Sequence, residues 1–136
     1  MAHAFVSGRM VTPHGVRRAA LLLEDGPADG TGGVIRAVCE VGDLPLDADI
    51  VDFGDQAILP GLVDTHVHIN EPGRTEWEGF ATATRAAAAG GYTTLVDMPL
   101  NCLPETTTVA ALELKRAAAA GQCTVDWAAW GGVVAD

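Results

Sequence analysis

The sequence predicts an α/β fold in which a strand-rich N-terminal segment precedes alternating strands and helices. Short runs rich in Val, Leu and Ile, separated by turn-forming clusters, fill the chain up to Pro60-Gly61. After Gly61, apolar strand-like runs alternate with alanine-rich stretches of helical periodicity. Such alternation predicts parallel strands joined by right-handed crossovers.

The N-terminal segment is expected to form short strands, and their spacing predicts a small β-sandwich or part of one. These strands are expected over residues 4–10, 18–23, 34–41 and 50–53. The stretch EDGPADGTGG, residues 24–33, is expected to be an exposed hairpin loop. It lacks the Gly-Lys-Ser/Thr ending of a phosphate loop, and its acidic side chains would repel phosphate.

The C-terminal part is expected to contain three strands and two helices. The strands are expected over residues 62–68 and 92–98 and from residue 124 onward, and the helices over residues 76–90 and 106–120. In the first helix, Trp77, Phe80, Thr84 and Ala87 share one face at 3.6-residue spacing. A complete (β/α)8 barrel needs about 250 residues. We therefore expect about three of eight barrel strands in a truncated chain, with a smaller open doubly wound sheet as the alternative.

Composition excludes several classes of partner. The 136 residues include 8 Lys and Arg against 18 Asp and Glu, so the net charge is −10, which disfavours nucleic acids and anionic membrane surfaces. No apolar run reaches the roughly 18 residues of a membrane helix, and the first ten residues lack a secretory signal. Three cysteines form no CxxC pair. We expect a cytoplasmic protein with reduced thiols.

The strongest candidate site is Asp64-Thr65-His66-Val67-His68, at the end of the first C-terminal strand. Alternate strand residues share a face, so His66 and His68 point the same way with Cα atoms about 6.6 Å apart. Two imidazoles at that separation can converge on one metal ion. Asp64 has the same parity and is expected to face the same side. The alternative is an ordinary histidine pair that bonds water or nearby carbonyl groups.

Asn101 follows the second of these strands, so it would lie at the same end of a parallel sheet as the histidines. An asparagine amide both donates and accepts hydrogen bonds, which suits a cyclic imide or ureide. The alternative role is a turn residue that bonds its own backbone.

The stretches LPGLVDTHVHINEPG and WEGFATATRAAAAGGYTTLVDMPLN resemble the cyclic amidohydrolases of the amidohydrolase superfamily: dihydroorotases, hydantoinases and allantoinases. EPGRTEWEGF, MPLNCLPETT and LELKRAAAAGQCTVDWAAWGGVV are most similar to allantoinases. Dihydroorotases usually carry an arginine that binds the substrate carboxylate at the position where this chain has Asn70. The resemblance implies that residues 1–57 are a β-sandwich segment and residues 58–136 the first part of a TIM-type (β/α)8 barrel, truncated after about the third strand.

The same resemblance implies a site for two Zn²⁺ ions, or other divalent metals, in which His66 and His68 hold the more buried ion. Asp64 would orient a ligand imidazole and Asn101 would bind substrate. The bridging carboxylated lysine, two further histidines and the general-base aspartate are expected beyond Asp136, so no catalytic residue is expected within the chain. Lys115 is expected to be a solvated residue on a helix face, and Arg85 and Arg116 surface charges.

The implied function is hydrolysis of the hydantoin ring of allantoin to allantoate in purine breakdown. The implied partner is a small cyclic ureide, and the assembly common in the family is a homotetramer. Two alternatives stay open. One is a hydantoinase, dihydropyrimidinase or dihydroorotase-like enzyme. The other is a non-catalytic amidohydrolase-like fragment, and we expect the 136-residue chain alone to be inactive.

Overall fold

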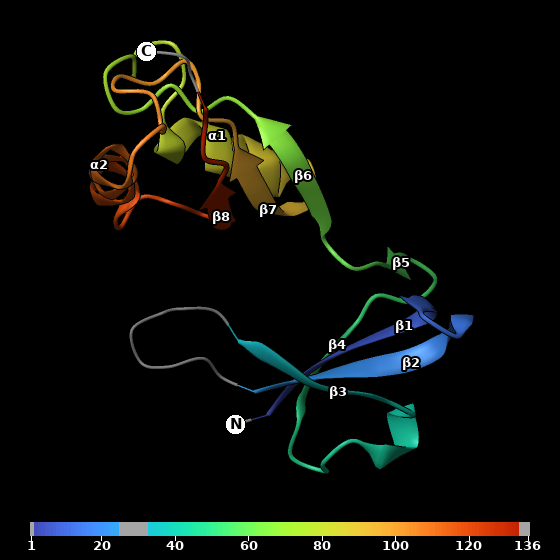
Figure 1. Ribbon diagram of the computed structural model, residues 1–136. Coiled ribbons are helices and arrows are strands. Elements are labelled where there is room, and N and C mark those ends of the chain that lie inside the picture. The colour runs from blue at the N-terminus through green and yellow to red at the C-terminus, as the bar shows by residue number, and fades with distance from the viewer. Residues whose placement is uncertain (1, 25–32, 134–136) are drawn as a thin grey trace. The chain divides into compact units, whose positions relative to one another are not determined.

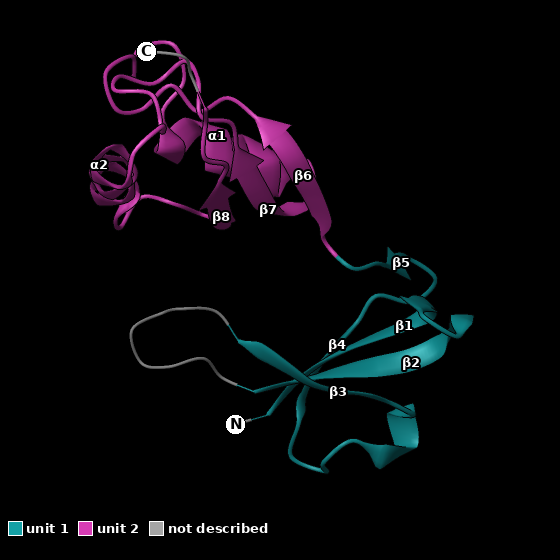
Figure 2. Ribbon diagram, viewed as in Figure 1, with its two compact units in different colours: residues 1–60 teal, residues 61–136 magenta. Residues whose placement is uncertain are grey.

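The computed structural model describes residues 2–24 and 33–133, in two compact units that comprise residues 1–60 and residues 61–136 (Figure 1, Figure 2). The first unit contains strands and a short 3-10 helix, η1 (Val41–Asp43). The second contains alternating strands and helices. The predicted change of pattern after Pro60-Gly61 therefore coincides with the division between the units.

The first unit is built on one five-stranded sheet in which β1 is central. Its strands are β1 (His3–Thr12), β2 (Gly15–Glu24), β3 (Val34–Cys39), β4 (Asp49–Asp52) and β5 (Ala57–Ile58). The order is β3-β2-β1-β4, and β5 also pairs with β1. The β1–β2 and β2–β3 pairs are antiparallel, whereas β4 and β5 run parallel to β1.

The four strands expected in this unit are confirmed, and β5 is an addition that is too short to give a periodic signal. Glu24 pairs with Val34, so β2 and β3 form the expected hairpin. The expected loop lies mostly outside the described residues. The described part of the unit holds one sheet, and its completion to a sandwich stays a prediction.

The second unit is a three-stranded parallel sheet, in the order β6-β7-β8, with a helix in each crossover (Figure 1). Its elements are β6 (Leu62–Val67), α1 (Phe80–Ala89), β7 (Tyr92–Asp97), α2 (Val109–Ala119) and β8 (Asp126–Ala129). This confirms the predicted βα alternation with parallel strands. The later start of α1 has a local cause, because Oε2 of Glu71 accepts the Phe80 N–H at 2.9 Å and caps the helix there.

The core of the second unit lies between α1 and the sheet. Phe80 is fully buried, and its ring centroid lies 4.8 Å from that of Trp127. Ile69, Leu95 and Ala119 complete the buried cluster. Trp77 does not join the helix face as expected, because it precedes the helix and is 63% exposed.

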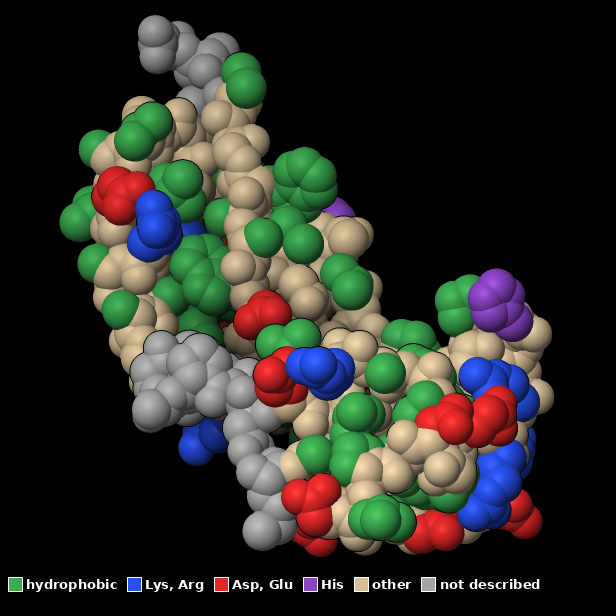
Figure 3. All heavy atoms as spheres, turned by 90° about the horizontal axis from the view of Figure 1, so that it is seen from below, with side chains coloured by type: hydrophobic (Ala, Val, Ile, Leu, Met, Phe, Trp, Pro, Cys, Tyr) green, Lys and Arg blue, Asp and Glu red, His purple; other side chains and the backbone are tan. Residues whose placement is uncertain are grey.

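The surface carries mixed charges. On the face drawn in Figure 3, basic side chains lie next to acidic ones. Exposed ion pairs of the first unit join Arg17 to Glu40 and Arg36 to Glu24. In both pairs the positive charge of an arginine lies beside a carboxylate. Within the described residues, no helix combines the length and the apolar character that crossing a bilayer requires.

The loops that follow β6 and β7 pack closely at Gly73. The Leu103 N–H donates to the Pro72 carbonyl oxygen at 2.8 Å. Gly73 has φ +92°, and a Cβ there would lie 2.8 Å from the Leu103 carbonyl oxygen. Gly73 is therefore needed both for its left-handed backbone and for the close approach of the second loop.

We predict that Gly73→Ala lowers the free energy of unfolding more than Gly121→Ala does. Both glycines have positive φ, which costs an alanine about 1–2 kcal/mol. A Cβ at Gly121 would meet nothing within 4 Å, so only Gly73→Ala adds a clash, of about 1–3 kcal/mol. Urea unfolding of the two variants measures the difference, and equal losses would contradict the packing argument.

Candidate metal and active site

His66 and His68 lie at the carboxyl end of β6 with their rings close together. Both side chains are exposed, and the ring centroids are 5.4 Å apart with an interplanar angle of 62°. Within the described part of the chain, neither imidazole makes a hydrogen bond. Two unengaged imidazoles at this distance suit a shared metal ion, which binds ring nitrogens at about 2.0–2.1 Å.

These two histidines are an incomplete ligand set. Among residues 2–24 and 33–133, no group of three or more His, Cys, Asp or Glu side chains is arranged to hold a metal. The pair by itself offers two ligands, and its metal-binding role stays a prediction. The choice of metal stays a prediction.

A bulge interrupts β6 after Asp64, but Asp64 and His68 line the same hollow. The register with β7 shifts between Asp64 and Val67, so simple alternation fails there. Asp64 lines the same hollow as Val67 and Leu95. Its Oδ1 accepts the backbone N–H of His66 at 3.0 Å. In this structure Asp64 fixes the His66 backbone, and a contact with a ligand imidazole stays a prediction.

Trp130, just after β8, holds the other side of the same peptide group. Its indole Nε1 donates to the Thr65 carbonyl oxygen at 3.0 Å, and its backbone N–H donates to the Asp97 carbonyl oxygen at 2.9 Å. The Thr65–His66 peptide is therefore held by a side chain at each of its polar atoms. Sequence reasoning did not single out Trp130 for this role.

Lys115 is not the solvated residue that we expected. Its side chain is 1% exposed, and Nζ lies 2.5 Å from Oδ2 of Asp97, which is fully buried. Nζ also donates to the Ile69 carbonyl oxygen at 3.2 Å. The spacing in the sequence indicates this burial, because Lys115 lies four residues from both Ala111 and Ala119, the other buried residues of α2. Arg85 and Arg116 are exposed as expected.

Asp97 is the second buried partner that the sequence did not reveal. Its Oδ1 accepts the Ile69 N–H at 2.6 Å. Burial raises the pKa of the Asp97 carboxyl above its ordinary value, although the Ile69 N–H and the Lys115 ammonium oppose that rise. The available sequence signal was an acidic residue directly after the apolar pair Leu95-Val96 at the end of a strand.

Asn101 lies in the loop after β7, with an exposed side chain and φ +70°. It is the only non-glycine residue with positive φ in the described chain. Asparagine is one of the few residues that adopt this left-handed conformation readily, so the backbone fits the alternative role of a turn residue. The contact of Asn101 with substrate stays a prediction.

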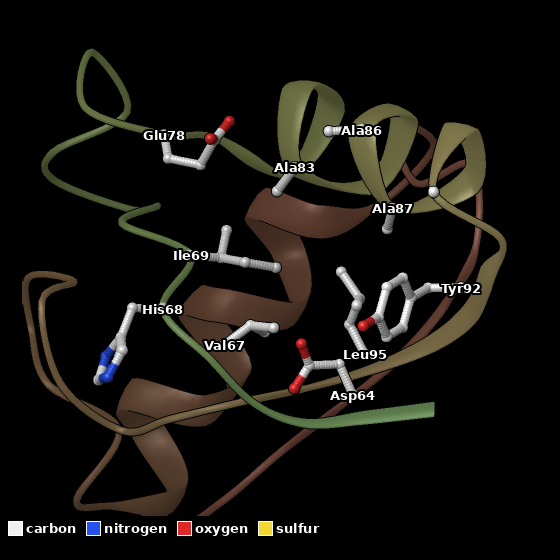
Figure 4. A pocket seen from close by; sticks show the side chains of 11 residues that line it. Asp64, Val67, His68, Ile69, Glu78, Ala83, Ala86, Ala87, Tyr92 and Leu95 are labelled. Atoms are coloured by element: carbon white, nitrogen blue, oxygen red, sulfur yellow. The ribbon is translucent and has the colours of Figure 1, made fainter. Parts of the chain in front are cut away.

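A hollow of about 310 Å³ lies between β6 and α1 (Figure 4). Its walls are mainly apolar, with three alanines of α1 facing Val67, Ile69 and Leu95. His68 reaches its rim but points away from Ile69, and neither His66 nor Asn101 lines it. The candidate site is therefore defined by the strand ends and their loops rather than by this hollow.

Comparison with known proteins agrees with this geometry. The model of the amidohydrolase family matches residues 57–135. The chain belongs to the amidohydrolase family. Its relatives include an allantoinase of Streptomyces avermitilis, 53% identical over 130 residues that cover 96% of this chain and 28% of that protein. An allantoinase of Saccharomyces cerevisiae is 62% identical over 77 residues, which cover 57% of this chain and 17% of that protein.

Among solved structures, the L-hydantoinase (dihydropyrimidinase) of Arthrobacter aurescens superposes on this amidohydrolase chain with a TM-score of 0.78. The two share 30% sequence identity over 97% of this chain and 28% of the hydantoinase chain. The chain thus spans between 17% and 28% of the length of these three proteins.

We predict that Trp130→Phe lowers the free energy of unfolding by about 1 kcal/mol, because it keeps an aromatic ring but removes the hydrogen bond to Thr65. Trp77→Phe is the matched control, because both tryptophans are exposed, at 63% and 52%, and a phenyl ring can keep the contact with the Arg74 guanidinium. Its change should stay within about 0.5 kcal/mol. Urea unfolding of both variants tests this. An equal, negligible loss in the two would show that the indole N–H contributes nothing.

Proposed function

We propose that the protein carrying this chain is a metal-dependent cyclic amidohydrolase that opens the hydantoin ring of allantoin to give allantoate. The observation that supports this most strongly is the pair of close, unengaged imidazoles at the end of β6. The allantoinase relatives support the choice of substrate. The larger architecture would be a small β-sandwich joined to a (β/α)8 barrel, of which this chain supplies the first part.

In this proposal His66 and His68 hold a divalent metal, for which we favour Zn²⁺. When bound, the metal lowers the pKa of water toward about 7 and polarises the ring carbonyl. Asp64 and Trp130 keep the His66 backbone in place, through its N–H and through the Thr65 carbonyl. Asn101 would use its amide to donate to and accept from the imide edge of the ring.

The presence of an asparagine at position 70 favours a substrate that lacks a carboxylate. Asn70 is 9% exposed. Its backbone N–H donates to the Glu78 carbonyl oxygen, and its backbone carbonyl oxygen accepts the Arg74 N–H, both at 2.9 Å. A neutral amide at this position offers no cation for the carboxylate of a dihydroorotate-like substrate. A neutral cyclic ureide fits better.

We predict that His66→Ala and His68→Ala each lower kcat/KM on allantoin by more than about 100-fold, beyond the loss typical of residues that only support a ligand. His14→Ala, an exposed histidine in the first unit, should leave turnover unchanged. Steady-state kinetics on the full-length protein measure this, together with the metal content of each variant. Turnover retained in both site variants would refute the metal assignment.

Steady-state kinetics on a set of cyclic amides test the proposed choice of allantoin as substrate. We expect a higher kcat/KM for allantoin than for dihydropyrimidines or dihydroorotate. The structural likeness to L-hydantoinase favours one second candidate, a hydantoinase or dihydropyrimidinase. Faster opening of dihydropyrimidines than of allantoin would establish that alternative instead.

A further inference from the structure

One buried ion pair holds both backbone polar groups of Ile69, the residue that follows His68. The Ile69 N–H donates to Oδ1 of Asp97 at 2.6 Å, and Nζ of Lys115 donates to the Ile69 carbonyl oxygen at 3.2 Å. The two charged groups meet at 2.5 Å, with side-chain exposures of 1% for Lys115 and 0% for Asp97. Asp97 ends β7 and Lys115 lies on α2, so two elements converge on this one residue.

The ion pair is a costly way to stabilise this core. Removing two charges from water opposes their attraction, and apolar replacements of similar volume are often neutral or stabilising. Nζ of Lys115 lies 5.8 Å from the centroid of the apolar Phe80 ring. An aliphatic side chain at position 115 would fit these surroundings, so net stability does not explain the charges.

The charged side chains do provide hydrogen bonds to the backbone, which two aliphatic side chains cannot form. β6 ends at Val67, and beyond it the backbone has left the regular hydrogen-bond ladder. Buried peptide groups need partners. Asp97 and Lys115 supply them on both sides of Ile69, whose side chain is 1% exposed. The first of these bonds fixes the plane of the peptide that joins His68 to Ile69, and with it the backbone conformation of His68.

We propose that Asp97 and Lys115 are positioning residues for His68, acting together through the backbone of Ile69 to hold the imidazole in its ligating direction. This inference rests on the proposed metal role of His66 and His68. The pair does not touch the metal or the substrate. It orders the segment that presents one ligand, while Asp64 and Trp130 order the segment that presents the other.

The test uses the full-length protein in its metal-free form and Co²⁺ as the probe. Lys115→Met removes the cation and leaves the Ile69 carbonyl unpaired. We expect Co²⁺ to bind about 10- to 100-fold more weakly, as for other residues that support a ligand, and its visible absorption spectrum to change. Arg116→Met is the matched control, because this neighbouring cation is exposed and, among the residues that the structure describes, forms its ion pair with Glu113. Its Co²⁺ affinity and spectrum should equal those of the wild type.

The double variant Asp97→Val/Lys115→Met separates positioning from stability, because it buries no charge and removes the side-chain partners of both Ile69 backbone groups. We expect it to unfold at a urea concentration near that of the wild type but to bind Co²⁺ at least about 10-fold more weakly. Amide hydrogen exchange at Ile69 should be faster than in the wild type.

Wild-type Co²⁺ affinity and spectrum in the folded double variant would overturn the positioning role while leaving the proposed function intact. His66→Ala and His68→Ala are measured alongside. If neither of them changes Co²⁺ binding, the metal assignment itself fails, and the positioning role fails with it.

Discussion

The backbone from Thr65 to Asn70 leaves the sheet while it still carries two imidazoles, and the rest of the site depends on how that backbone is held. A strand within a sheet obtains its hydrogen bonds from its neighbours, but a bulge interrupts the pairing of β6 with β7. Side chains then supply the missing partners: Asp64 and Trp130 before His66, and Asp97 and Lys115 after His68. Four residues, from β6, β7, α2 and the segment just after β8, thus define one short stretch of backbone.

Much of this fold could be predicted from the sequence, because it depends on local periodicity. Two-residue alternation and β-branched runs located the strands, and 3.6-residue spacing located both helices. The spacing of His66 and His68 likewise placed their rings near each other, which the centroid distance of 5.4 Å confirms. These features depend on neighbours in the chain, so a local pattern is sufficient to find them.

The features that could not be predicted depend on partners outside the local periodic pattern. Charge suggested that Lys115 is solvated, because lysine is rarely buried unless it is paired, and nothing local identifies Asp97 as its partner. The bulge that interrupts β6 after Asp64 depends on the pairing with β7. The start of α1 depends on the carboxylate of Glu71, nine residues before the amide that it accepts.

The distance along the chain between Lys115 and Ile69 has a consequence for biosynthesis. The ammonium group that binds the Ile69 carbonyl is made 46 residues after it. At about 5–20 residues per second, a ribosome releases the histidine-bearing segment several seconds before the helix that rigidifies it. The Ile69 carbonyl group therefore lacks its Lys115 partner until α2 has been synthesised and has packed against the second unit.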